Sequence, residues 1–75
     1  MADKVTFNIV KEIAVLRAPN ENGWVREVNL VSWNDNEPKV DIRDWNSDHT
    51  KMSKGITLTP GEALQLAKYI QIALG

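Results

Sequence analysis

A helix-start signal near the C-terminus, Thr59-Pro60-Gly61-Glu62, most constrains what this chain can fold into. The Thr59 hydroxyl can cap the first helical turn, Pro60 suits the first helical position, and the Glu62 side chain can reach back to the Thr59 amide. This capping box predicts a helix from Pro60 to about Leu74. The residues that precede it must build the rest of the fold.

Those preceding residues carry the two-residue apolar alternation of half-buried strands. We expect strands at 5–16, with a bulge near 11–12, and at 24–33, 39–45 and 55–58. Turn-forming residues separate the strands at 17–23 and 34–38, and a polar loop spans 46–54. Four strands followed by one helix predict an α+β fold, in a single domain that spans residues 1–75.

Composition excludes several classes of protein. The 75 residues include no cysteine, which rules out a disulfide framework and fits a reducing, cytoplasmic location. We expect no membrane partner, because no apolar run is long enough to span a bilayer and the N-terminus lacks the apolar stretch of a signal peptide. The formal net charge is −1, with five basic and six acidic residues between Trp24 and Lys54. Net charge therefore gives no support for nucleic-acid binding, and only the placement of the charges can.

The predicted helix is apolar over most of its circumference. Its polar side chains between Ala63 and Leu74 recur every three residues and form one narrow stripe. One face of a small sheet covers about half of a helix, so the remaining apolar surface needs a second partner. The same helix of a second copy would supply it in a homodimer. The interface residues would be Leu66, Tyr69, Ile70 and Ala73. The alternative is that the first strand curls over the helix within one chain.

The third predicted strand points Val40 and Ile42 toward the core and the helix, and its odd-numbered residues away from them. Aromatic rings stack unpaired bases at about 1–3 kcal/mol per base, and Lys and Arg track the phosphates between them. An interleaved basic and aromatic face therefore favours single-stranded nucleic acid. The residues expected to contribute are Trp24, Arg26, Trp33, Lys39, Arg43 and Trp45, with Lys51 and Lys54 in the following loop.

Other interpretations of these residues stay open. The tryptophans could form the core, because Trp is highly buried on average, or the exposed aromatics could dock a protein partner. Asp41 and Arg43 could be a solvated ion pair. His49 lacks the companions of a metal ligand and is expected at the surface. Asp41, Asp44 and Asp48 invite a metal-dependent hydrolase, but Asp41 and Asp44 have opposite strand parity. We therefore expect no catalysis, no metal, no cofactor and no small-molecule substrate.

The run Lys39-Val-Asp-Ile-Arg-Asp-Trp45, followed by Asp48, Met52 and Lys54-Gly-Ile-Thr-Leu-Thr-Pro60, resembles the positive cofactor four family of transcriptional coactivators. The likeness is closest to the bacterial YdbC-like branch, and it covers residues 28–75 well and the first strand loosely. It implies a curved, four-stranded antiparallel sheet with one C-terminal helix, dimerising through that helix. It also implies binding of single-stranded DNA, with RNA as an alternative, little sequence preference and no enzyme activity.

The resemblance implies roles for individual residues. Arg43 matches the strand arginine of the family, Trp45 falls at its aromatic position, and Lys54 matches the lysine before the glycine. Lys51 is placed by its loop. Trp33 lies near the aromatic residue of the second strand, with a register shifted by the longer hairpin. The chain lacks the serine-rich basic tail of eukaryotic members, which favours plain DNA binding in transcription or in replication and repair over coactivation of the eukaryotic type.

Overall fold

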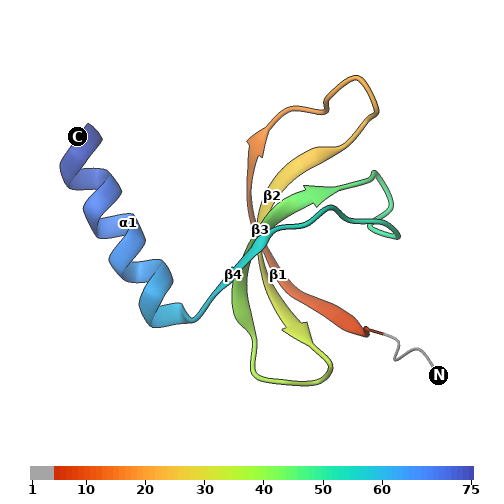
Figure 1. The fold of residues 1–75 in the computed structure, drawn as a ribbon, viewed down its shortest axis with the longest axis horizontal. Coiled ribbons are helices and arrows are strands. Elements are labelled where there is room, and N and C mark those ends of the chain that lie inside the picture. The colour runs from red at the N-terminus through yellow and green to blue at the C-terminus, as the bar shows by residue number, and fades with distance from the viewer. Residues whose placement is uncertain (1–4) are drawn as a thin grey trace.

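A computed structural model describes residues 5–75 and confirms four strands followed by one helix (Figure 1). The strands are β1 (Phe7–Arg17), β2 (Val25–Trp33), β3 (Lys39–Trp45) and β4 (Ile56–Leu58), and the helix is α1 (Pro60–Leu74). The expected bounds of β3 and α1 are confirmed to the residue, and those of the other strands differ by one or two residues. The first four residues, expected to carry no signal peptide, lie outside the described part of the chain.

The strands form one antiparallel sheet in the order β1-β2-β3-β4, so each strand pairs with its neighbour in sequence. The β1–β2 register shifts at three places, between Ile9 and Lys11, between Glu12 and Ala14, and between Val15 and Arg17. The expected bulge near residues 11–12 is confirmed by the first two shifts. Bulges bend a strand and increase its twist, so they favour curling of the sheet at its β1 edge.

The sheet curls strongly toward one of its faces. Phe7 pairs with Trp33 at one end of β2, whereas Trp45 pairs with Val25 at the other end. These ends would lie roughly 26 Å apart on a straight strand at about 3.3 Å per residue. The ring centroids of Phe7 and Trp45 are nevertheless only 5.1 Å apart. We call the concave side that holds these rings the inner face, and the side that faces α1 the outer face.

The core lies on the inner face, contrary to the expectation that it would lie between the sheet and the helix. Its fully buried apolar side chains are Val31 and Trp45, and the polar side chains of Asn29 and Asp41 are buried beside them. Val40 and Ile42 face the helix as expected but stay half-buried. The physical reason is the curl, which brings side chains from both ends of the sheet together on its concave side.

The helix begins as its sequence predicts. The Thr59 amide donates to Glu62 Oε1 at 2.8 Å, and the Glu62 amide donates to Thr59 Oγ1 at 3.2 Å. The hydrogen bond from the Thr59 amide is the main reason that the pKa of Glu62 is lowered, and the nearby charge of Lys39 lowers this pKa further. Within residues 5–75, no helix has both the length and the apolar character needed to cross a bilayer.

Beyond its first turn, α1 stands apart from the sheet (Figure 1). All of its residues are at least partly exposed, including the apolar Leu64 at 73% and Leu66 at 42%. An apolar groove of about 570 Å³ lies between α1 and the outer face. It is lined from the sheet by Ile13, Leu16, Val28, Val40, Ile42 and Leu58, and from the helical segment by Pro60, Ala63, Leu64, Leu66, Ala67 and Ile70.

Candidate nucleic-acid interface

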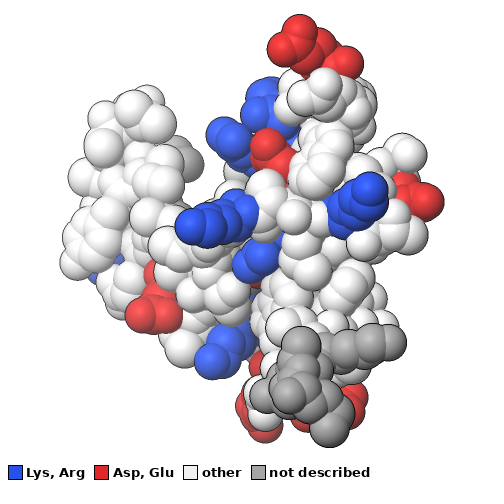
Figure 2. All heavy atoms as spheres, turned by 45° about the vertical axis from the view of Figure 1, so that its right-hand side comes forward, with Lys and Arg blue, Asp and Glu red and all other residues white. Residues whose placement is uncertain are grey.

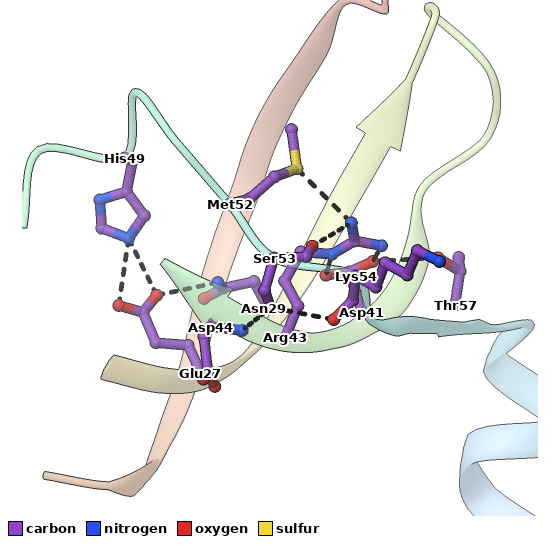
Figure 3. Close-up of polar contacts among 10 residues, drawn as sticks. All are labelled: Glu27, Asn29, Asp41, Arg43, Asp44, His49, Met52, Ser53, Lys54 and Thr57. Atoms are coloured by element: carbon purple, nitrogen blue, oxygen red, sulfur yellow. Dashed lines mark hydrogen bonds and ion pairs between the residues drawn. The ribbon is translucent and has the colours of Figure 1, made fainter. Parts of the chain in front are cut away.

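Arg43 of β3 is the centre of the polar contacts on the inner face (Figure 3). Its Nε and Nη2 atoms donate to the two carboxylate oxygens of Asp41 at 2.6 and 2.7 Å. Its Nη1 atom donates to the Ser53 carbonyl oxygen at 3.2 Å and contacts the Met52 sulfur at 3.5 Å. The guanidinium carbon also lies 4.7 Å from the centre of the Trp33 ring. Arg43 therefore joins β2, β3 and the loop that leads to β4.

Asp41 and Arg43 form an ion pair, but a buried one rather than the solvated pair considered from the sequence. The Asp41 side chain is 0% exposed and that of Arg43 is 13% exposed. Burying charges is costly unless they are paired and hydrogen-bonded. Both Asp41 oxygens accept from Arg43, and one also accepts from the Thr57 hydroxyl at 2.9 Å. The pair meets that condition and fixes the plane of the guanidinium.

Gly55 allows the chain to pass close over Arg43 just before β4. A Cβ atom at position 55 would overlap the Ile42 carbonyl oxygen and the Arg43 Cβ atom, and would lie 3.0 Å from Arg43 Nε. A side chain at this position would thus push the backbone away from β3. The close packing beside Arg43 therefore explains why a glycine follows Lys54.

The aromatic residues of the inner face pack against one another. The Phe7 ring lies 5.8 Å from Trp33 and 5.1 Å from Trp45, and the Trp45 ring lies 5.3 Å from the His49 ring. Trp45 is fully buried, which corrects the expectation that it presents its indole at the surface. Trp33 is half-buried. Both indole N–H groups are buried without a hydrogen-bond partner among the described residues.

The loop 46–54 is ordered by hydrogen bonds of its own. Asn46 Oδ1 accepts from the Lys51 amide at 2.9 Å, and Asn46 Nδ2 donates to the Thr50 hydroxyl at 2.8 Å. That hydroxyl donates to Asp48 Oδ1 at 2.6 Å. This contact is the main reason that the pKa of Asp48 is lowered, and the Thr50 amide adds to the effect.

His49 ties this loop to the sheet instead of lying free at the surface. Its Nε2 atom lies 2.9 and 3.1 Å from the two Glu27 oxygens (Figure 3). Glu27 Oε1 also accepts from Asn29 Nδ2 at 3.0 Å. The sequence alone does not predict this contact, because it joins residues 22 positions apart. The only signal in the sequence was the alternation in β2, which places Glu27 and Asn29 on the same face of the sheet as Arg43.

All three of the expected lysines are exposed, Lys39, Lys51 and Lys54. Lys39 pairs with Val31, so its side chain leaves the sheet on the inner face. Lys51 and Lys54 belong to the loop 46–54. Figure 2 shows Lys and Arg spread across the middle of its view, with Asp and Glu mostly toward the rim. The placement of charge can therefore favour an anion although the net charge is negative.

Arg26 is separated from this group, because it faces the opposite side of the sheet from Arg43. It pairs in register with Asp44, and its Nε atom lies 2.9 Å from Asp44 Oδ1. Arg17 lies 3.1 Å from Asp44 Oδ2 and also donates to the Trp24 carbonyl oxygen at 3.3 Å. The hydrogen bond from Arg26, followed by the contacts of Arg17, lowers the pKa of Asp44. Trp24 lies half-buried beside this outer-face cluster.

The acidic residues do not gather into a metal site. Asp41 pairs in register with Asn29 and Thr57 on the inner face, whereas Asp44 lies on the outer face with Arg26. Within residues 5–75, no group of three or more His, Asp or Glu side chains is placed to hold a metal ion.

Comparison with known proteins relates this chain to a family and to a bacterial relative. The family model described as Transcriptional Coactivator p15 (PC4) matches residues 20–69, from the β1–β2 loop into α1. An uncharacterized protein of Treponema pallidum (strain Nichols) is 49% identical over 45 residues, which are 60% of this chain. The match spans about half of that relative's length, 53%.

Proposed function

Because the chain belongs to the Transcriptional Coactivator p15 (PC4) family, we propose that it binds single-stranded DNA on the inner side of the sheet, with little sequence preference. Membership in this family indicates a nucleic-acid-binding protein with a role related to transcription. The observation that carries the finer proposal is the set of exposed lysines, Lys39, Lys51 and Lys54, around the stacked pair of Arg43 and Trp33. We propose binding without catalysis, with RNA as the competing ligand in the test.

The lysines would supply the phosphate contacts. Each carries a compact charge on a flexible stem, which suits a backbone that presents phosphates without a fixed register. The exposed part of Trp33 would stack a base. We assign Trp45 a supporting role, because its buried ring packs on Phe7, which in turn packs on Trp33. This arrangement favours nucleic acid over a protein partner docked on an open aromatic surface.

The test is a titration of the protein with fluorescent oligo-dT, with oligo-rU and duplex DNA of equal length in parallel. We expect oligo-dT to bind more tightly than the duplex and its affinity to fall as salt is added. Each phosphate contact adds roughly 0.7 to the slope of log affinity against log salt for single strands. The triple variant Lys39→Ala, Lys51→Ala, Lys54→Ala should lose most of the affinity and about two units of that slope.

The matched control is Lys11→Ala, because Lys11 is exposed on β1 and pairs with Leu30 away from the inner face. It should bind as the wild type does. Absence of oligo-dT binding at low salt would exclude the proposed function, and binding that does not respond to salt would point to a different kind of partner.

We further propose that the functional unit is a homodimer in which α1 of a second copy fills the groove on the outer face. All twelve residues that line the groove are apolar, and α1 leaves Tyr69 60%, Ile70 48% and Leu66 42% exposed. Contiguous apolar surface of this kind is unusual on a monomer. Covering of α1 by β1 within one chain is not supported, because among the described residues the backbone of α1 comes close to β3 and β4 but not to β1. An isologous helix pair satisfies both copies at once.

A further inference from the structure

We propose that Arg43 is a positioning residue, which holds the loop 46–54 in place and so sets the positions of Lys51 and Lys54. This inference rests on the proposed function, and it goes beyond it because the strand arginine would otherwise be read as a phosphate contact. The three nitrogen atoms of Arg43 already donate to Asp41, Ser53 and Met52.

Little of the guanidinium is left for a ligand. A guanidinium has five N–H groups, and the Asp41 fork alone takes the two that point along one edge. One face of the group lies over the Trp33 ring, and its stem is covered by Gly55. The side chain is 13% exposed. A phosphate that took this fork would displace Asp41, a fully buried carboxylate whose further contact is the Thr57 hydroxyl.

The same contacts reach the end of the lysine-bearing loop. Arg43 donates to the Ser53 carbonyl oxygen. The Ser53 amide donates to the Asp44 carbonyl oxygen at 3.0 Å, and the Ser53 hydroxyl accepts from the Asp44 amide at 3.1 Å. Ser53 is thereby fixed next to Lys54. Toward its other end, the loop is pinned by His49 on Glu27.

Lys51 is linked to the same framework. Its amide donates to the Asn46 side chain, and its carbonyl oxygen accepts from the Asn46 amide at 3.1 Å. The neighbouring Met52 bridges back to Trp45 and touches Arg43. Loss of the Arg43 contacts would therefore displace both lysines together, because the segment between them is held through Met52 and Ser53.

The test uses the paired variant Asp41→Asn, Arg43→Gln, which removes one charge of each sign and so leaves the net charge unchanged. Hydrogen exchange of the amides of residues 51–55 should become at least about tenfold faster, while the amides of the β1–β2 pairing keep their protection. This readout needs no nucleic acid. Unchanged exchange in residues 51–55 would overturn the proposal even if the protein binds DNA as proposed.

Oligo-dT affinity then separates positioning from direct contact. The paired variant should weaken binding in the wild-type background, but it should change the affinity of the Lys51→Ala, Lys54→Ala protein by less than about twofold. A direct phosphate contact would instead give multiplicative losses and a further fall of about 0.7 in the salt slope of the Lys51→Ala, Lys54→Ala protein. That result would overturn the proposal. If the wild type fails to bind oligo-dT, the proposed function fails and the exchange measurement still decides the role of Arg43.

Arg43→Lys provides a second variant in case the paired one does not fold. Lysine keeps the positive charge beside Asp41. It lacks the guanidinium fork that binds Asp41 and Ser53 simultaneously. We expect faster exchange in residues 51–55 and weaker oligo-dT binding here as well. Full affinity with native loop protection would contradict a role for the fork.

Discussion

Trp45 is held in the inner-face core by the rings of Phe7 and His49, at 5.1 and 5.3 Å. Replacing it with Ala should lower the free energy of unfolding by about 3–5 kcal/mol, because a large buried ring leaves a cavity. Urea unfolding followed by circular dichroism measures the change. Trp24→Ala is the matched control, since that half-buried side chain should cost less. A Trp45→Ala protein as stable as the wild type would contradict the assignment of Trp45 to the core.

Gly55→Ala should destabilise the protein although it adds a single methyl group. That group would overlap the Ile42 carbonyl oxygen and the Arg43 Cβ atom, so β4 would have to move away from β3. We expect a loss of about 1–3 kcal/mol, typical of overpacking, measured by thermal unfolding. Gly61→Ala is the control, because a Cβ atom there has open space and Ala is the better helix former. Equal melting temperatures for the two variants would refute the close packing at Gly55.

At the scale of single residues, the sequence indicates which side chains share a face but not how deeply each is buried. The alternation in β3 correctly groups Arg43 with Trp45, since parity depends on the strand alone. It does not reveal that the sheet curls toward that face and buries Trp45. The contacts of Arg43 with Ser53 and of His49 with Glu27 were also missed, because loop residues have no periodicity from which a partner can be predicted.

Among the elements, α1 carries a charge-dependent stabilisation at its first turn. The pKa of Glu62 lies below its ordinary value of 4.5, chiefly because its carboxylate accepts from the Thr59 amide. A lowered pKa in the folded state stabilises it above the ordinary value, and this gain is lost as the pH falls through the folded pKa. The stability difference between the wild type and Glu62→Gln should therefore shrink as the pH is lowered from about 6 to about 3. Thermal unfolding across this range checks it, and a difference independent of pH would exclude the capping contact.

The elements were the part of the fold most accessible from sequence. Local chemistry determines the ends of α1, where Thr59, Pro60 and Glu62 act within one turn, and local alternation identifies β3. Local sequence patterns do not predict that α1 is separated from the sheet beyond its first turn. A helix that is apolar on most sides indicates that more of its surface must be buried. It does not indicate how much of that surface the sheet of the same chain buries.

For the whole molecule, the proposed dimer predicts a sharp effect of one charge in the groove. Ile70→Glu should shift the protein from dimer to monomer, because Ile70 lines the groove and stays 48% exposed in a single copy. Analytical ultracentrifugation at low micromolar concentration gives the mass of the species, against 8.5 kDa for one chain. Gln65→Glu is the control on the polar stripe of the helix and should leave the mass unchanged. A wild-type monomer would refute the helix pairing.

The nearest-neighbour order of the sheet, described above as a matter of topology, also has consequences for the time course of folding. Every strand pairs with the strand next to it in sequence, so the chain closes short loops first, and such chains fold fast for β-rich proteins. The buried Trp45 should thus gain its protected environment in a first-order step whose rate does not depend on protein concentration. Association of two copies would follow as a slower second-order step, which stopped-flow fluorescence at several dilutions would resolve.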